Sequence, residues 1–217
     1  MKFDTWVFHK ALNGSSSIVE HDPWGGLMSS STIQLASQSP RRKMLLEACG
    51  LQVQVLPQYG DETWPKAESP EDVMLGIARA KLAGARDVNA DLPLVVADTA
   101  VWLNGAPLGK PHSEAHALEM LRDLSGSCHE VLSSVGLAFR GQTSLLTVET
   151  RIWFRALSDA ALTRYVASGE PMDKAGAYGI QGAAGAFVDR VEGSYTNVVG
   201  LPIAETLAGL ESLGWNR

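Results

Sequence analysis

Two turn signals constrain most strongly what this chain of 217 residues can fold into. Asn104-Gly105 follows the apolar run 93–103, and Arg140-Gly141 separates two further strand-like runs, 131–139 and 145–154. Two-residue turns of this kind join antiparallel strands. Elsewhere strand patterns alternate with helix patterns, an order that favours parallel pairing. We therefore expect an α/β or α+β domain, built on one mixed sheet and without an internal repeat.

Capping residues indicate where the helices begin. Ser39-Pro40 and Ser69-Pro70 each place a capping residue before a proline that suits the first helical turn. In the first of these helices, Met44, Leu45 and Ala48 lie at helical spacing and should pack against the core. The expected helices lie within 39–50, 69–85, 113–124, 158–169 and 201–213, and the expected strands are 32–36, 51–56, 93–103, 131–139, 145–154 and 187–188.

Composition excludes several classes of protein. Hydrophobic residues make up 45% and charged residues 19% of the chain, which is incompatible with disorder as the main state. No apolar run approaches the roughly 18 residues that span a bilayer, so no membrane partner is expected. A net charge of −6 disfavours nucleic acid as a partner, since such binding depends on many cations. The two cysteines, Cys49 and Cys128, form no Cys-x-x-Cys motif, and this fits a reducing, cytoplasmic location.

Residues 1–30 differ from the rest of the chain. They include the linker-like Gly-Ser-Ser-Ser run at 14–17 and no apolar stretch of signal-peptide length. We expect an extension that is either flexible or held on the surface by Trp6, Val7 and Phe8. The folded domain should then cover residues 31–217.

The turn Ser37-x-Ser39-Pro40-Arg41-Arg42 is the first candidate site. The amino end of a helix presents free N–H groups and partial positive charge. Two arginines in that first turn oppose the helix dipole, and a bound phosphate would resolve the conflict. The alternative is that Arg41 and Arg42 face solvent or pair with Glu47.

Asp98 is the second candidate, because it interrupts an apolar strand. Such a carboxylate is costly to bury unpaired, so it is either hydrogen-bonded at a strand end or functional. Asp61-Glu62 offers further oxygen ligands, although such a pair by itself more often indicates a solvated loop. Mg²⁺ is commonly held by one or two carboxylates together with substrate phosphates. Lys81, Lys110 and Lys174 supply cations that are not diagnostic by themselves.

Two tempting histidine motifs are better explained by packing or exposure. His112-x3-His116 lacks the glutamate of the zinc-protease motif and should lie at the surface. Cys128-His129 is a poor thiol–imidazole pair, because neighbouring residues of a strand point to opposite faces. Sheet or core packing is expected there.

Seven blocks occur in a recognisable order between residues 32 and 213. They are LASQSPRRKMLL at 35–46, DET at 61–63, ARAKL at 78–82, VVADTAVWLNGAPLGKP at 95–111, LRDLSGSCHEVLSSV at 121–135, GEPMDKAGAYGIQG at 169–182 and NVVGLP at 197–202. On these blocks the chain resembles the Maf family of nucleoside triphosphate pyrophosphatases. The resemblance implies an elongated mixed β-sheet flanked by helices in two lobes with a central cleft, similar to inosine triphosphate pyrophosphatase. It also implies a homodimer.

The resemblance implies an activity and a set of site residues. The activity is hydrolysis between the α- and β-phosphates of a nucleotide, with a divalent cation such as Mg²⁺ or Mn²⁺. The proton-accepting aspartate falls on Asp98. Two further catalytic residues fall on Lys81 and Lys110. Substrate-binding residues fall on Ser37, Arg42 and Lys174. Glu62 and Asp98 would bind the metal.

Base preference can be inferred from three further positions. Arg41, Thr99 and Gln181 resemble the branch that prefers dTTP and UTP, and a glutamine amide matches the imide edge of uracil or thymine. The resemblance also implies a role in removing unwanted pyrimidine nucleotides and a link to cell-division arrest. The alternatives are a 7-methyl-GTP pyrophosphatase and a non-enzymatic nucleotide-binding regulator of septum formation.

Overall fold

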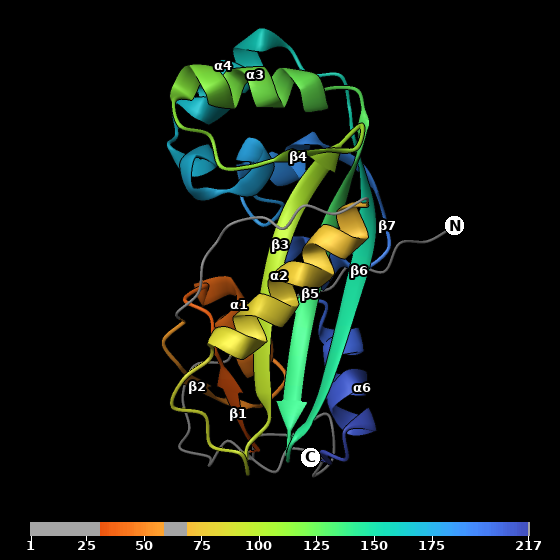
Figure 1. The fold of residues 1–217 in the computed structure, drawn as a ribbon. Helices are drawn as coiled ribbons and strands as arrows, with labels where there is room; N and C mark the ends of the chain where they lie inside the picture. The colour runs from red at the N-terminus through yellow and green to blue at the C-terminus, as the bar shows by residue number, and fades with distance from the viewer. Residues whose placement is uncertain (1–30, 59–68, 217) are drawn as a thin grey trace, which may run out of the picture.

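The protein folds around one mixed sheet, which the computed structural model describes together with its helices over residues 31–58 and 69–216 (Figure 1). The strands are β1 (Thr32–Leu35), β2 (Gln52–Val55), β3 (Leu94–Leu103), β4 (Ala106–Leu108), β5 (Cys128–Phe139), β6 (Gln142–Phe154) and β7 (Val188–Glu192). The α-helices are α1 (Pro40–Glu47), α2 (Pro70–Gly84), α3 (Glu114–Leu124), α4 (Asp159–Val166), α5 (Tyr195–Val199) and α6 (Ile203–Ser212); 3₁₀ turns η1 (Glu170–Asp173), η2 (Ala175–Ala177) and η3 (Ala183–Phe187) complete the elements.

The sheet is mixed, as predicted. Its strand order is β2-β1-β3-β5-β6-β7, with β4 pairing β3. The pairs β1–β2 and β1–β3 are parallel, whereas all pairs from β3 through β7, and the β3–β4 pair, are antiparallel. The two antiparallel hairpins turn at Asn104-Gly105 and Arg140-Gly141. The turn signals therefore located the antiparallel half of the sheet correctly.

The long strands β3, β5 and β6 connect two lobes (Figure 1). One hydrophobic cluster gathers around α3 and α4 and includes Leu121, Phe154 and Leu162. A second cluster lies among β1, α1 and α6 and includes Leu35 and Leu210. Helix α2 crosses the face of the sheet between the two ends. This arrangement confirms the elongated, helix-flanked sheet that the resemblance implied.

Helix α2 lies unusually close to the sheet at Gly136. A Cβ atom at this position of β5 would lie 2.6 Å from Leu82 Cγ of α2 and 2.8 Å from Val96 Cγ2 of β3. The absence of a side chain at residue 136 therefore permits the contact. Lys81, the residue before Leu82, is thereby carried close to β3.

Most predicted elements are confirmed, with small shifts at their ends. The prediction of the buried face of α1 was right only for Leu45, which packs against the core. Met44 is 44% exposed and Ala48 is also exposed, whereas Arg42 and Leu46 are buried. Ser39 takes the N-cap position without a side-chain capping bond. The short helix α5 was not predicted.

The amino-terminal prediction cannot be compared with the fold, since residues 1–30 lie outside the described residues. The same holds for Asp61-Glu62. Within the two described ranges, the helices are all too short or too polar to cross a membrane.

Candidate active site

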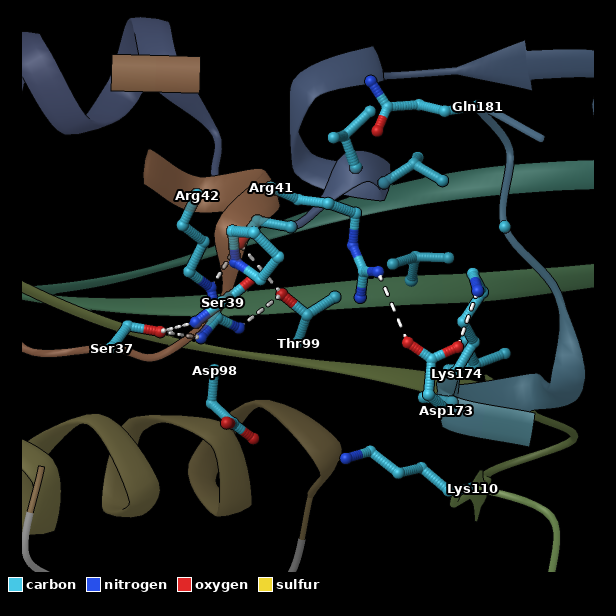
Figure 2. Close-up of a pocket in the computed structure, with 18 of the residues that line it drawn as sticks. Ser37, Ser39, Arg41, Arg42, Asp98, Thr99, Lys110, Asp173, Lys174 and Gln181 are labelled. Carbon is cyan, nitrogen blue, oxygen red and sulfur yellow. Dashed lines mark hydrogen bonds and ion pairs between the residues drawn. The ribbon is translucent and has the colours of Figure 1, made fainter. Parts of the chain in front are cut away.

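A cavity of about 810 Å³ lies where β1, β3 and α2 face the segment that follows α4. It is lined by side chains from both lobes. Nine of the predicted site residues line it: Ser37, Arg41, Arg42, Lys81, Asp98, Thr99, Lys110, Lys174 and Gln181. Glu62, the tenth, lies outside the described residues. Residues spread over 145 positions of sequence are thus brought together, and Figure 2 shows most of them around the cavity.

The edge of β3 explains why two successive residues of one strand both reach the cavity. Strand β1 pairs with β3 only at Leu94 and Val95, and β4 pairs with it only from Val101 onward. The intervening edge of β3 is therefore not covered by a strand on this side. Asp98 points toward α2 and Thr99 toward α1, yet both border the same space (Figure 2).

Asp98 and Lys81 form the deepest charged pair of the cavity. Lys81 Nζ donates to Asp98 Oδ1 and also to the carbonyl of Ala97 at 3.3 Å. The side chains are 14% exposed for Lys81 and 26% for Asp98. The pair is thus held by a helix and a strand, while part of the carboxylate remains accessible from the cavity.

Arg42 is buried and ties three segments together. Its Nε donates to the Gly200 carbonyl at 2.9 Å, Nη1 to Ser37 Oγ at 2.9 Å and Nη2 to Thr99 Oγ1 at 3.3 Å. Burial lowers the pKa of Arg42, and the nearby Asp98 charge partly opposes that shift. The prediction that Arg42 faces solvent or pairs with Glu47 is wrong, because Arg42 is buried and Glu47 instead lies near Lys43.

Thr99 belongs to the same network. Its Oγ1 lies 2.7 Å from Ser133 Oγ and 3.2 Å from the Gly200 carbonyl. Ser133 in turn donates to the Asn197 carbonyl at 3.2 Å. The network fixes the wall beside Asp98. We refer to Lys81, Asp98, Arg42 and Thr99 as the floor of the cavity.

The opposite side of the cavity is more exposed. Arg41 Nη1 lies 3.9 Å from Asp173 Oδ2, and Lys174 Nζ lies 2.6 Å from Asp173 Oδ1 (Figure 2). The hydrogen bond from Lys174 lowers the pKa of Asp173, and the charges of Lys174 and Arg41 lower it further. Gln181 is exposed above this group. We refer to Arg41, Asp173, Lys174 and Gln181 as the rim.

The cavity is electropositive although the chain is acidic. Arg41, Arg42, Lys81, Lys110 and Lys174 line it, against the carboxylates of Asp98, Glu170 and Asp173. Cations converging on one space favour a polyanionic ligand such as a triphosphate chain.

The donor set fits a divalent cation that is shared with a substrate. Among residues 31–58 and 69–216, no three His, Cys, Asp or Glu side chains gather closely enough to hold a metal ion by themselves. Asp98 is the carboxylate of the floor and is partly accessible from the cavity, whereas Asp173 and Glu170 line the other side. Mg²⁺ is commonly bound by one or two carboxylates and substrate phosphate oxygens.

Both histidine predictions are confirmed. His112 is exposed and stacks on His116 with ring centroids 4.1 Å apart. His129 is fully buried, and its Nε2 lies 2.8 Å from Tyr178 Oη. Burial lowers the pKa of His129 to about 4. His129 is thus a neutral core residue.

Three polar residues of this region were not singled out from the sequence. Glu170 and Asp173 lie in the GEPMDKAG block and Asn197 in the NVVGLP block, so the motifs contained them, but nothing in local spacing indicated their contacts. Asn197 is fully buried and donates to the Val131 carbonyl at 2.9 Å.

The chain is similar to known proteins over most of its length. Residues 32–213 match the family described as Maf-like protein. The chain is 49% identical over 176 residues to the dTTP/UTP pyrophosphatase of Salmonella typhimurium, covering 81% of this chain and 89% of that protein. It is 50% identical over 193 residues to the dTTP/UTP pyrophosphatase of Anaeromyxobacter dehalogenans, covering 84% and 96%. Identity to the dTTP/UTP pyrophosphatase of a Geobacillus species is 44% over 181 residues, covering 83% and 97%.

Proposed function

Because the chain belongs to the family of Maf-like proteins, we propose that it is a nucleoside triphosphate pyrophosphatase that hydrolyses dTTP and UTP to the monophosphate and pyrophosphate. The observation that carries this proposal is the Lys81–Asp98 pair on the floor of a cavity lined by further cations. The curated relatives named dTTP/UTP pyrophosphatase support the substrate.

The geometry suits cleavage between the α- and β-phosphates. That reaction places negative charge on the phosphate oxygens and on the leaving pyrophosphate, so fixed cations stabilise its transition state. Lys110 and Lys174 border the space that the phosphates would occupy. Asp98 accepts a proton from the attacking water, and Lys81 keeps the carboxylate oriented.

A divalent cation, Mg²⁺ or Mn²⁺, completes this proposal. Asp98 and Glu62 would hold it together with substrate oxygens, and it would supply neutralisation of phosphate charge. Ser37, near the amino end of α1, and Arg42 would shape the phosphate-binding wall, Ser37 by accepting the Arg42 hydrogen bond.

Base selection is assigned to the rim and to Thr99. The exposed amide of Gln181 can pair with the imide edge of uracil or thymine. Arg41 lies on the same side of the cavity. In the cell, we propose removal of unwanted pyrimidine nucleotides, carried out in the cytoplasm by a homodimer, with residues 31–217 as the catalytic domain.

The first experiment is pyrophosphate release in the presence of Mg²⁺ across dTTP, UTP, CTP, ATP, GTP and 7-methyl-GTP. Preference for dTTP and UTP supports the proposal. Preference for 7-methyl-GTP would keep the reaction and overturn the assignment of the base. Tight binding without any turnover would instead favour a regulator that binds nucleotide.

Metal dependence is tested in the same assay. We expect EDTA to abolish activity and Mg²⁺ or Mn²⁺ to restore it, because a divalent ion would add charge neutralisation of the phosphates to that of the fixed cations. Activity that survives exhaustive chelation would remove the metal from the mechanism. Equilibrium binding of Mn²⁺ in the presence of a non-hydrolysable dTTP analogue provides a readout that does not depend on turnover.

A further inference from the structure

The loop that carries Gln181 is anchored at both of its ends. Gly179 N–H donates to Tyr165 Oη at 3.3 Å, and Ala183 N–H donates to Glu170 Oε2 at 3.1 Å. A backbone bond from Gly182 N–H to the Gly179 carbonyl at 3.0 Å closes the turn between them. The position of Gln181 therefore depends on two side chains outside the loop.

Those two side chains are coupled to each other. Tyr165, near the carboxyl end of α4, donates its hydroxyl to Glu170 Oε1 at 3.0 Å. Burial, the largest cause, raises the pKa of Tyr165, and the bond to Glu170 raises it further. The hydroxyl thus keeps its proton, donates to Glu170 and accepts from Gly179. Each oxygen of the Glu170 carboxylate holds a different group.

The fit of the carboxylate against the loop is close. A Cβ atom at Gly182 would overlap Glu170 Oε1 and would lie 2.7 Å from Oε2. Residue 182 has to lack a side chain for the carboxylate to reach Ala183. The main-chain carbonyl of Glu170 also accepts from Lys174 Nζ at 2.6 Å. Glu170 thus contacts both Lys174 and the Gln181 loop.

We propose that Glu170 is a positioning residue for base selection. It holds the Gly179–Ala183 turn in the position in which the Gln181 amide can hydrogen-bond to the base. This inference rests on the function proposed above. A glutamine amide that can move freely pairs equally well with the imide edge of uracil or with the amino edge of cytosine, because it can rotate to offer either pattern. Discrimination needs the loop to be fixed, and the Glu170 carboxylate supplies that restraint.

The test compares Glu170→Gln with wild type for dTTP and CTP. A glutamine at 170 has no charge and one acceptor oxygen instead of two, so Ala183 N–H loses its charged acceptor or the Tyr165 hydroxyl has to become the acceptor, and the hold on the loop weakens. We expect the dTTP-to-CTP ratio of kcat/KM to fall about tenfold, the size of effect that loss of a hydrogen bond to a charged group produces. The change should reside in KM for dTTP, with kcat retained within about threefold, since the main-chain contact to Lys174 remains.

Three further variants separate positioning from general damage. Tyr165→Phe removes the second anchor and should lower the same ratio by a smaller factor. Glu192→Gln is the matched control, because that carboxylate accepts a hydrogen bond from Arg151 but does not line the cavity, and its ratio should match wild type. In a Gln181→Ala background, Glu170→Gln should leave the ratio unchanged, because the group being positioned is absent.

An unchanged ratio in both Glu170→Gln and Tyr165→Phe overturns the inference, as does an equal fall in the Gln181→Ala background. If Glu170→Gln does not fold, Tyr165→Phe decides. If the wild-type protein hydrolyses none of the nucleotides, the proposed function fails. In that case the ratio of the dissociation constants for dTTP and CTP, compared between wild type and Glu170→Gln, tests the positioning role separately.

Discussion

The floor and the rim of the cavity carry similar charges but are supported very differently. Lys81 and Asp98 stand on a helix of 15 residues and a strand of 10, and both side chains are largely buried. Asp173 and Gln181 stand on a 3₁₀ turn and a loop, and both are exposed. Groups that act on the reacting atoms and groups that discriminate between bases both need positions fixed to about half an ångström. The floor is fixed by burial on regular elements, and the rim by the hydrogen bonds that anchor the Gln181 loop. In the function proposed above, the floor carries Asp98 and Lys81, which would act on the reacting atoms, and the rim carries Gln181, which would select the base.

The largest effect should come from Asp98→Asn on the floor. The change is isosteric and leaves Lys81 its bond to the Ala97 carbonyl, but it removes the proton acceptor. We expect turnover of dTTP to fall at least about a thousandfold, within the range attributed to general bases, with dTTP still bound. Pyrophosphate release and calorimetric binding measure the two. Turnover equal to wild type would eliminate the assigned role of Asp98.

A second effect concerns the hydrogen bond that connects the rim to the hydrophobic core. Tyr178, the residue before the Gln181 loop, bonds to the buried His129. Because burial lowers the pKa of His129 to about 4, the unfolded chain takes up this proton first as pH falls below about 6.5. The free energy of unfolding should therefore decrease between pH 6.5 and pH 4, by up to about 3 kcal/mol from this residue.

Urea unfolding at pH 7, 5.5 and 4.5 measures this dependence. His129→Gln, which keeps a hydrogen-bonding group near Tyr178, serves as the reference because it does not titrate. The difference between the two proteins isolates the histidine from other groups. Parallel pH curves for wild type and variant would show that His129 is not held neutral by burial.

The smallest effect should come from Asp173→Asn on the rim. Asp173 lies beside both Arg41 and Lys174, so it competes with an anionic substrate for these cations. Its removal should lower KM for dTTP about twofold to fourfold at low ionic strength and leave kcat unchanged, since exposed ion pairs are weak and screened by salt.

Asp159→Asn is the control for this change. Asp159 is similarly exposed and paired with Arg122, but it does not line the cavity. A rise in KM for Asp173→Asn, or an equal fall for Asp159→Asn, would argue against competition at the rim.

Local sequence signals accounted for most of the fold. Ser113 and Ser158 cap α3 and α4 by accepting from backbone N–H groups three positions on, which is information contained within a few residues. The buried face of α1 was mispredicted because Arg42 is drawn inward by the carbonyl of Gly200, 158 positions away. No pattern within one helix contains that acceptor.

The sequence likewise predicted only part of the candidate site. Motif resemblance indicated nine residues that the structure brings to one cavity. The part played by Glu170 could not be predicted, because its partners Tyr165 and Ala183 become neighbours only when α4, η1 and the Gln181 loop have folded together. Contacts of this kind are set by tertiary structure alone.

The missing side chain at Gly136 has a consequence for how this protein can vary. The Leu82 side chain occupies the space that a methyl group at 136 would need, and Lys81 precedes Leu82 on the same helix. A substitution on β5, at a position that does not line the cavity, would therefore displace the ammonium group beside Asp98. Random mutagenesis scored by activity should find few tolerated substitutions at residue 136, and compensation should require smaller residues at both 82 and 96.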